Sequence, residues 1–208
     1  MAFALHGFRD ITIDGSGSLF LFRGRMSPFV LEGVQGATLR NFTIDWKRAF
    51  HDELTVVSRD LETKSFVVEV DPDRYPYSVV DGQLFSDRYD WQDPFGANIV
   101  FDPRTRAPIY RTKQYGINAQ RPMTVVPAGE NRLRIQASIR NEPPPPGSVL
   151  ITYGVKPTNR LCPAIHVANS KDIVLENVTV HEAGGMGLIV ERTENVHLNH
   201  MVVTSNPE

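Results

Sequence analysis

Short runs of alternating apolar and polar residues recur along the chain at an offset in the low twenties. Residues 171–181 (KDIVLENVTVH) align with residues 194–204 (ENVHLNHMVVT) at an offset of 23 positions. Residues 37–45 (ATLRNFTID) and residues 10–14 (DITID) fit the same frame. Because alternate residues of a strand point to opposite faces, each run predicts a β-strand with one buried face. A repeat of this length, built from short strands, is typical of a β-solenoid.

The repeat is interrupted and then resumes. Residues 28–33 (PFVLEG) mirror residues 163–170 (PAIHVANS), and both lead into an aligned strand. The residues between carry short strands separated by Pro, Gly and Asp turns, which predict an antiparallel barrel or sandwich. We therefore expect an all-β chain with three parts: first solenoid coils at 1–45, an inserted antiparallel β-barrel or sandwich at 46–160, and continued coils at 161–208.

Stacking of the coils predicts two columns of polar residues, since strands of successive coils pair about 4.8 Å apart. The first predicted column holds Asp10, Asn41, Asn177 and His200. The second, at a strand end, holds Asp14, Asp45, His181 and Thr204. Stacked Asn side chains can bond to one another and to the turn backbone, which favours a structural role for the first column. Side chains at a strand end can face a groove, so the second column is the better candidate for chemistry.

Composition narrows the classes of function. The chain has 208 residues, a formal net charge of −2 and 41% hydrophobic residues, which fits a globular protein. The absence of a basic excess argues against nucleic acid as the main partner. No apolar run approaches the roughly 20 residues that a spanning helix needs, and no signal peptide is visible at the start. Cys162 is the only cysteine, so an internal disulfide is excluded. We expect Cys162 to be a buried, inert thiol.

The residues around the second column suit carbohydrate recognition. Glu182 follows His181, and the glycines of residues 183–187 (AGGMG) either form a corner or clear a groove floor for a ligand. Trp46 follows Asp45, and an indole can stack on a sugar or pack at a domain junction. The histidines lack the spacing and cysteine partners of a zinc site, so we expect no metal and no cofactor.

Glycoside hydrolysis needs two carboxyl groups that flank the scissile bond, roughly 5–9.5 Å apart. In the predicted stack Asp45 is followed by His181 and Thr204, so the coils offer no acidic pair at matching positions. We therefore expect no catalytic residue within this chain.

Four segments together resemble glycoside hydrolase family 110, the exo-acting α-1,3-galactosidases. They are residues 11–17 (ITIDGSG), 22–29 (FRGRMSPF), 41–46 (NFTIDW) and 181–187 (HEAGGMG). The resemblance implies a right-handed parallel β-helix with a barrel inserted early, and an oligosaccharide or polysaccharide substrate with terminal galactose. It also implies inversion by aspartates on coils beyond Glu208, an extracellular or periplasmic location, and no activity of this chain alone. The groove neighbours that it implies are His181, Glu182, Gly184, Gly185, Asp45 and Trp46.

Two alternatives remain. A pectin-degrading β-helix enzyme would need a groove rich in Lys and Arg, which the aligned turn positions do not supply. A non-catalytic carbohydrate-binding or adhesin solenoid would leave recognition to the inserted barrel.

Overall fold

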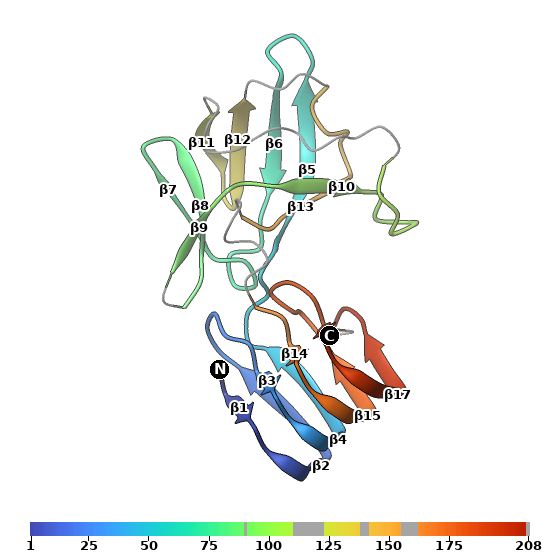
Figure 1. The fold of residues 1–208 in the computed structure, drawn as a ribbon. Helices are drawn as coiled ribbons and strands as arrows, with labels where there is room; N and C mark the ends of the chain where they lie inside the picture. The colour runs from blue at the N-terminus through green and yellow to red at the C-terminus, as the bar shows by residue number, and fades with distance from the viewer. Residues whose placement is uncertain (90, 110–122, 138–141, 155–161, 207–208) are drawn as a thin grey trace. The chain divides into compact units, whose positions relative to one another are not determined.

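A computed structural model describes residues 1–89, 91–109, 123–137, 142–154 and 162–206 (Figure 1). The described residues form strands and turns and contain no helix, so the all-β prediction is confirmed. The chain divides into two compact units: Met1–Phe50 with Arg160–Glu208, and His51–Asn159. No helix in the described part of the chain has the length and apolar character to cross a membrane.

The first unit contains two parallel sheets of four strands each (Figure 1). One sheet has the order β1 (Phe3–His6), β3 (Phe29–Glu32), β14 (Ile165–Ala168) and β16 (Leu188–Glu191). The other has the order β2 (Arg9–Phe22), β4 (Gln35–Trp46), β15 (Lys171–Val180) and β17 (Glu194–Val203). The chain alternates between the sheets, and we call each consecutive pair a coil: β1/β2, β3/β4, β14/β15 and β16/β17.

The coils stack in the register predicted for Asn41, Asn177 and His200. Asn177 lies between the pairs Glu176–Arg40 and Val178–Phe42, which places it opposite Asn41. The pairing of β15 with β17 places His200 on its other side. The φ angles of the three residues are 58°, 51° and 53°, so the backbone bends at this column through the left-handed region. Asn177 Nδ2 donates to Asn41 Oδ1 at 3.1 Å, and this part of the prediction is confirmed.

The predictions for Asp10 and Asp14 were wrong. Asp10 aligns with Gly36, because Arg9 faces Gln35 and Ile11 faces Ala37. Asp14 faces Arg40 and binds it, with Arg40 Nε donating to Asp14 Oδ2 at 2.8 Å. Residues 11–14 (ITID) resemble residues 42–45 (FTID) in sequence, but residues 10–14 pair with residues 36–40, five positions before the predicted partners. Residues 18–22 face the second half of β4, after a bulge that leaves residues 15–17 opposite Asn41. The offset between β2 and β4 is 26 residues before the shift (Ile11 to Ala37) and 24 after it (Ser18 to Phe42), against 23 between β15 and β17.

Alternate residues of the parallel strands fill the interior of the first unit. Leu39, Ile44, Leu175 and Val180 are each 0% exposed. Burying one such side chain contributes roughly 1.5–3 kcal/mol. The Phe29 ring extends this core, with its centroid 4.5 Å from that of Phe3 and 5.1 Å from that of Phe42. The regular spacing of apolar residues in the sequence therefore corresponds to a continuous buried stack.

The second unit is antiparallel. A six-stranded sheet has the order β10 (Asn98–Phe101), β13 (Val149–Thr152), β5 (Asp52–Asp60), β6 (Ser65–Glu69), β12 (Arg132–Ala137) and β11 (Met123–Gly129). A three-stranded sheet contains β7 (Tyr77–Val80), β8 (Gln83–Asp87) and β9 (Gln92–Pro94). The buried core of this unit includes Leu54, Val68, Leu133, Ile135 and Leu150.

A buried ion pair lies inside the second unit. The Arg88 guanidinium binds the Asp52 carboxylate with both prongs, at 3.0 Å and 3.1 Å, and Ser86 Oγ donates to the same carboxylate. The side chains of Arg88 and Asp52 are 2% and 7% exposed. Burial raises the pKa of the Asp52 carboxyl, and the positive charge of Arg88 opposes that rise. The pair joins the start of β5 to the residue that follows β8.

Candidate functional site

Asp45, His181 and Thr204 form one column in the first unit, where β4 and β15 end. His181 N donates to Ile44 O at 2.8 Å, and Thr204 N donates to Val180 O at 3.1 Å. These bonds continue the strand register beyond the pair Val180–Ile44. The three residues therefore occupy successive coils, as the sequence predicts for this part of the second column.

The Asp45 carboxylate is buried and bound on both oxygens. Its residue is 4% exposed. Oδ1 accepts a hydrogen bond from Trp46 N at 2.7 Å, and Oδ2 accepts one from Asn206 Nδ2 at 2.8 Å. Hydrogen bonds to a buried carboxylate offset the cost of removing it from water. In this arrangement Asp45 holds the end of β4 against the segment around Asn206.

His181 and Glu182 are partly exposed at the same corner. His181 Nδ1 lies 3.1 Å from Thr204 O. Because a carbonyl oxygen only accepts, a neutral His181 donates from Nδ1 and offers Nε2 as an acceptor. Glu182 has a φ of 49°, and its Oε1 accepts a hydrogen bond from Asn206 N at 3.4 Å. A polar ligand at this corner would meet one imidazole and one carboxylate.

The two glycines of the predicted site differ in surroundings. Gly184 is buried and forms a β-bridge with Cys162, which is buried as expected. A Cβ added at Gly184 would lie 2.8 Å from the nearest carbon of the Phe50 ring. Gly185 is exposed. Gly184 is thus needed for close packing against Phe50. Gly185, three residues after Glu182 in the sequence, has an exposed backbone.

Trp46 lies in the core of the first unit. Its residue is 4% exposed, and its ring meets the Phe50 ring edge-on at a centroid distance of 5.6 Å. The indole Nε1 is buried and has no hydrogen-bond partner among the described residues. With this burial, Trp46 presents no open face on which a sugar could stack. Its role is to pack against Phe50 in the core.

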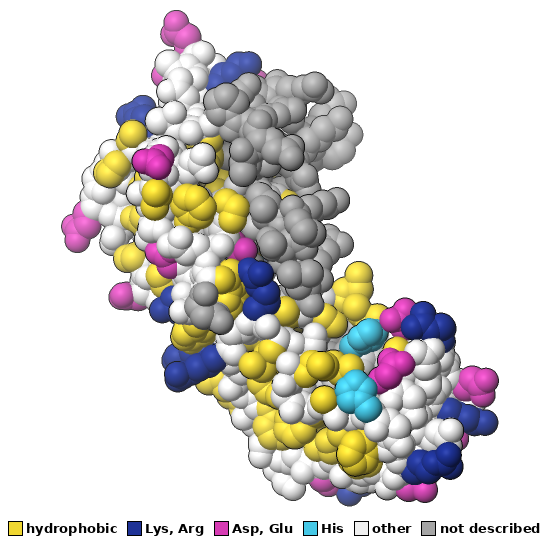
Figure 2. Space-filling view, turned by 60° about the vertical axis from the view of Figure 1, so that its left-hand side comes forward, with side chains coloured by type: hydrophobic (Ala, Val, Ile, Leu, Met, Phe, Trp, Pro, Cys, Tyr) yellow, Lys and Arg dark blue, Asp and Glu magenta, His cyan; other side chains and the backbone are white. Residues whose placement is uncertain are grey.

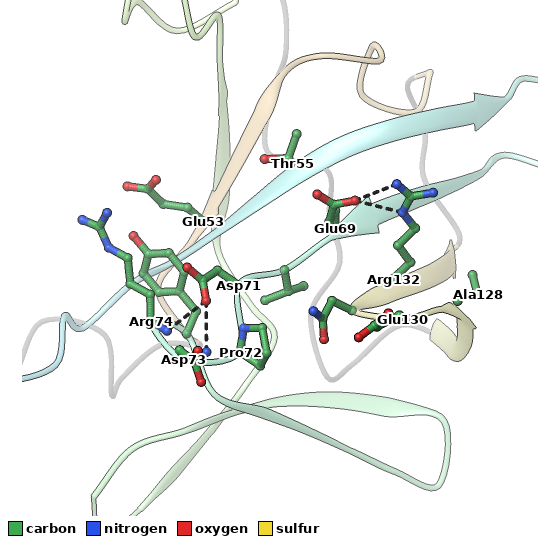
Figure 3. A pocket seen from close by; sticks show the side chains of 14 residues that line it. Glu53, Thr55, Glu69, Asp71, Pro72, Asp73, Arg74, Ala128, Glu130 and Arg132 are labelled. Carbon is green, nitrogen blue, oxygen red and sulfur yellow. Dashed lines mark hydrogen bonds and ion pairs between the residues drawn. The ribbon is translucent and has the colours of Figure 1, made fainter.

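The second unit contains a cavity of about 840 Å³ (Figure 3). Its lining includes five carboxylate side chains and two arginines. These are Glu53, Glu69, Asp71, Asp73, Glu130, Arg74 and Arg132. They come from β5, from β6 and the loop after it, and from the hairpin between β11 and β12. The sequence analysis missed this cavity, because its residues are brought together only by the sheet.

Several of the cavity's charges are already bound. Arg132 Nη2 lies 2.8 Å from Glu69 Oε2, and Asp71 Oδ1 accepts from the backbone N of Asp73 at 3.0 Å (Figure 3). A hydrogen bond from His51 lowers the pKa of Glu53. The described residues contain no group of three or more His, Cys, Asp or Glu side chains arranged to hold a metal ion. Each carboxylate oxygen can accept more than one hydrogen bond, so the acidic side chains of the lining can still accept from hydroxyl and amine groups.

The chain is similar to known proteins over both of its units. Residues 53–150 match the family model described as GLAA-B beta-barrel domain I. The chain is 28% identical over 194 residues to alpha-1,3-galactosidase B of Akkermansia muciniphila, covering 93% of the chain and 23% of that protein. It is 28% identical over 211 residues to alpha-1,3-galactosidase B of Bacteroides thetaiotaomicron, covering 99% of the chain and 33% of that protein.

A further relative extends the similarity to the other named type. The chain is 28% identical over 202 residues to alpha-1,3-galactosidase A of Shewanella woodyi, covering 97% of the chain and 32% of that protein. The chain thus spans between about a quarter and a third of the length of these three relatives. The predicted resemblance is confirmed: the chain is homologous over nearly its whole length to proteins named alpha-1,3-galactosidase, and residues 53–150 match the GLAA-B beta-barrel domain I family.

Proposed function

We propose that this chain is part of an exo-glycosidase that releases terminal α-1,3-linked galactose with inversion of configuration. The observation that carries the proposal is homology to proteins named alpha-1,3-galactosidase over 93–99% of the chain. The two parallel sheets are then two faces of a right-handed parallel β-helix, and residues 46–160 are the domain inserted between its coils. An extracellular or periplasmic location, where such glycans occur, is part of the same proposal.

The corner at His181 serves as one wall of the sugar site. His181 Nε2, the Glu182 carboxylate and the backbone at Gly185 are the groups that reach the surface, and they suit the hydroxyl groups of a sugar. Asp45, Trp46 and Gly184 lie beneath them and hold the corner in shape. This division of roles assigns the predicted residues to two layers, only one of which would contact substrate.

The acid and base of an inverting reaction are supplied from outside this stretch. Such carboxyl groups stand roughly 6.5–9.5 Å apart and leave room for a water molecule. Asp45 is 4% exposed with both oxygens engaged, so of the two carboxylates at the described corner, Asp45 and Glu182, only Glu182 reaches the surface. Relatives three to four times as long as the aligned region have ample further chain to provide them.

The direct test uses a longer protein that contains this sequence. Galactose release from α-1,3-, α-1,4- and α-1,6-linked galactosides would be measured, and the anomer formed first would be identified by NMR. We expect release from the α-1,3 linkage with β-galactose as the first product. The chain of 208 residues alone is expected to give no turnover. Cleavage of other glycosides, with no galactose released from any substrate, would refute the proposal.

A second candidate function is glycan binding by the inserted unit, and the cavity of about 840 Å³ favours it. The Arg132–Glu69 pair presents a planar set of donors and acceptors that suits vicinal hydroxyls. Binding of the chain to a glycan array, with Arg132→Ala compared against Arg104→Ala in an exposed turn, tests this role. Equal binding by both variants would remove the cavity from consideration.

A further inference from the structure

A groove of about 450 Å³ lies on the first unit, on the sheet that contains β2, β4 and β15. Its lining comes from β2 near the bulge and from the two inner strands: Asp14, Ser16, Gly17, Asn41, Phe42, Thr43, Asn177 and Thr179. β4 and β15 each pair with a strand on both sides, so the floor of the groove belongs to the middle of the stack. The groove shares no lining residue with the cavity of the second unit.

The bulge of β2 forms one wall of the groove, and it packs directly on β4. A Cβ added at Gly15 would lie 2.6 Å from Phe42 Cβ and 2.8 Å from Asn41 O, so only a glycine fits there. Gly17 has a φ of 81°, and a Cβ added at Gly17 would meet no described atom within 4 Å outside its chain neighbours. The wall is therefore fixed at Gly15 and open to a ligand at Gly17.

A directed chain of hydrogen bonds crosses the floor of the groove. Asn177 Nδ2 donates to Asn41 Oδ1 at 3.1 Å, and Asn41 Nδ2 donates to Asp14 Oδ1 at 3.1 Å. Asp14 Oδ2 accepts from Arg40 Nε at 2.8 Å. The backbone hydrogen bond from Ser16 lowers the pKa of the Asp14 carboxyl, so the chain of bonds ends on a negative charge at neutral pH. This order fixes both amides and leaves Asn177 Oδ1 as an acceptor.

Two threonine hydroxyls complete the floor. Thr43 and Thr179 pair across β4 and β15, and neither hydroxyl forms a hydrogen bond to another described residue. Each can donate one hydrogen bond and accept others. The lining contains one carboxylate and neither lysine nor arginine. By contrast, hydrophobic side chains (yellow) gather over the first unit on the face that Figure 2 shows. The groove therefore suits an uncharged ligand with several hydroxyl groups.

The groove and the corner at His181 lie along the same strands. Thr179 stands two residues before His181, and Thr43 stands two residues before Asp45. Two residues along a strand return to the same face and cover roughly 6.6 Å. This length is comparable with that of one sugar unit. An oligosaccharide with one unit at the corner can therefore place its next unit in the groove.

We propose that the groove is a second sugar-binding subsite, which holds an uncharged unit of the glycan whose neighbouring unit lies at His181. The hydroxyls of Thr43 and Thr179 and the Asn177 amide bind the hydroxyls of this unit. The Asp14 carboxylate disfavours a unit that carries a carboxylate or a sulfate, because like charges repel. The inference rests on the proposed function for the sugar at the corner, whereas binding in the groove requires no galactosidase activity.

Nuclear magnetic resonance titration of the 208-residue chain with the disaccharide α-1,3-galactobiose tests the subsite. We expect saturable shifts of the amide signals of Thr43 and Thr179. Thr43→Val and Thr179→Val should each raise the dissociation constant roughly three- to tenfold, because each loses one hydrogen bond. Thr38→Val is the matched control: Thr38 is also half-buried on β4 but lies outside the groove, and it pairs with Val174, so valine suits its column.

The outcomes separate the subsite from the proposed function. No binding of galactobiose or of maltose, or an equal loss in Thr38→Val and Thr179→Val, would overturn the subsite even if a longer protein releases galactose. Binding of maltose in the groove without binding of galactobiose would support the subsite and contradict the preference for galactose.

The charge preference has its own test. The same galactobiose carrying one sulfate should bind at least threefold more weakly than the neutral disaccharide. Asp14→Asn should narrow this difference, whereas Glu62→Gln, at an exposed position of the second unit, should leave it unchanged. Equal binding of the two sugars by the unaltered chain, or the same effect of both variants, would overturn the assignment to uncharged sugars.

Discussion

Replacing Arg88 by methionine tests the buried ion pair of the second unit. The side chains of Arg88 and Asp52 are 2% and 7% exposed, and the guanidinium holds the carboxylate at 3.0 Å and 3.1 Å. Arg88→Met leaves the Asp52 carboxylate buried, with Ser86 as its remaining side-chain donor among the described residues. Removing one partner of such a pair costs about 3–5 kcal/mol of unfolding free energy, because the other charge stays uncompensated.

The cost should depend on pH in a defined direction. Burial raises the pKa of the Asp52 carboxyl, and Arg88 opposes the rise. In Arg88→Met the opposition is gone, so the folded-state pKa lies above the unfolded-state value. Such a group loses its penalty when it is protonated, so the variant regains stability as pH falls through the folded-state pKa. The destabilisation is therefore complete at about pH 8 and smaller at about pH 5.

Urea unfolding followed by circular dichroism and by tryptophan fluorescence measures this effect at both pH values. Asp52→Asn/Arg88→Met is the control, because it removes the charge together with its partner and should recover part of the loss at about pH 8. A loss below about 1 kcal/mol in Arg88→Met, or a loss that is the same at both pH values, would refute the reasoning.

The packing of the corner and the bend of the stack give two further predictions. Gly184→Ala should cost about 1–3 kcal/mol of unfolding free energy, because its Cβ would lie 2.8 Å from the Phe50 ring, whereas Gly185→Ala at an exposed position should be near neutral. Thermal unfolding of both variants checks this, and an equal loss would argue against the contact. Asn177→Ala should cost about 2 kcal/mol, from a left-handed φ of 51° and the lost bond to Asn41, while Asn177→Gly should lose only the bond. Urea unfolding that finds the glycine variant less stable than the alanine variant would contradict this account.

The stack was predictable because parallel pairing imposes a constant offset. Asn41, Asn177 and His200 align since each later coil repeats the same spacing of apolar residues. Asp10 and Asp14 were misplaced because residues 11–14 (ITID) resemble residues 42–45 (FTID) but pair with residues 37–40. Alternation alone does not distinguish the two halves of one long strand such as β4.

The candidate site was less predictable, because residue type does not determine exposure. Asp45 and Trp46 have the chemistry of a sugar site, yet their contacts with Asn206 and Phe50 bury them. Asn206 lies far from Asp45 in the sequence, and no local pattern connects the two. The cavity lining of the second unit, such as Glu69 and Arg132, likewise meets only through pairing of distant strands.

Disulfide trapping tests the stacked coils most directly. Thr43 and Thr179 pair across β4 and β15, although the inserted unit separates them in the chain. Neighbouring strands place such residues about 4.8 Å apart, within the range that a disulfide spans. In a Cys162→Ala background, Thr43→Cys/Thr179→Cys should therefore oxidise readily to an internal disulfide. Thr43→Cys/Val202→Cys, two strands apart in the same column, should not. Equal trapping of both pairs, or trapping of the second pair alone, would contradict the stack.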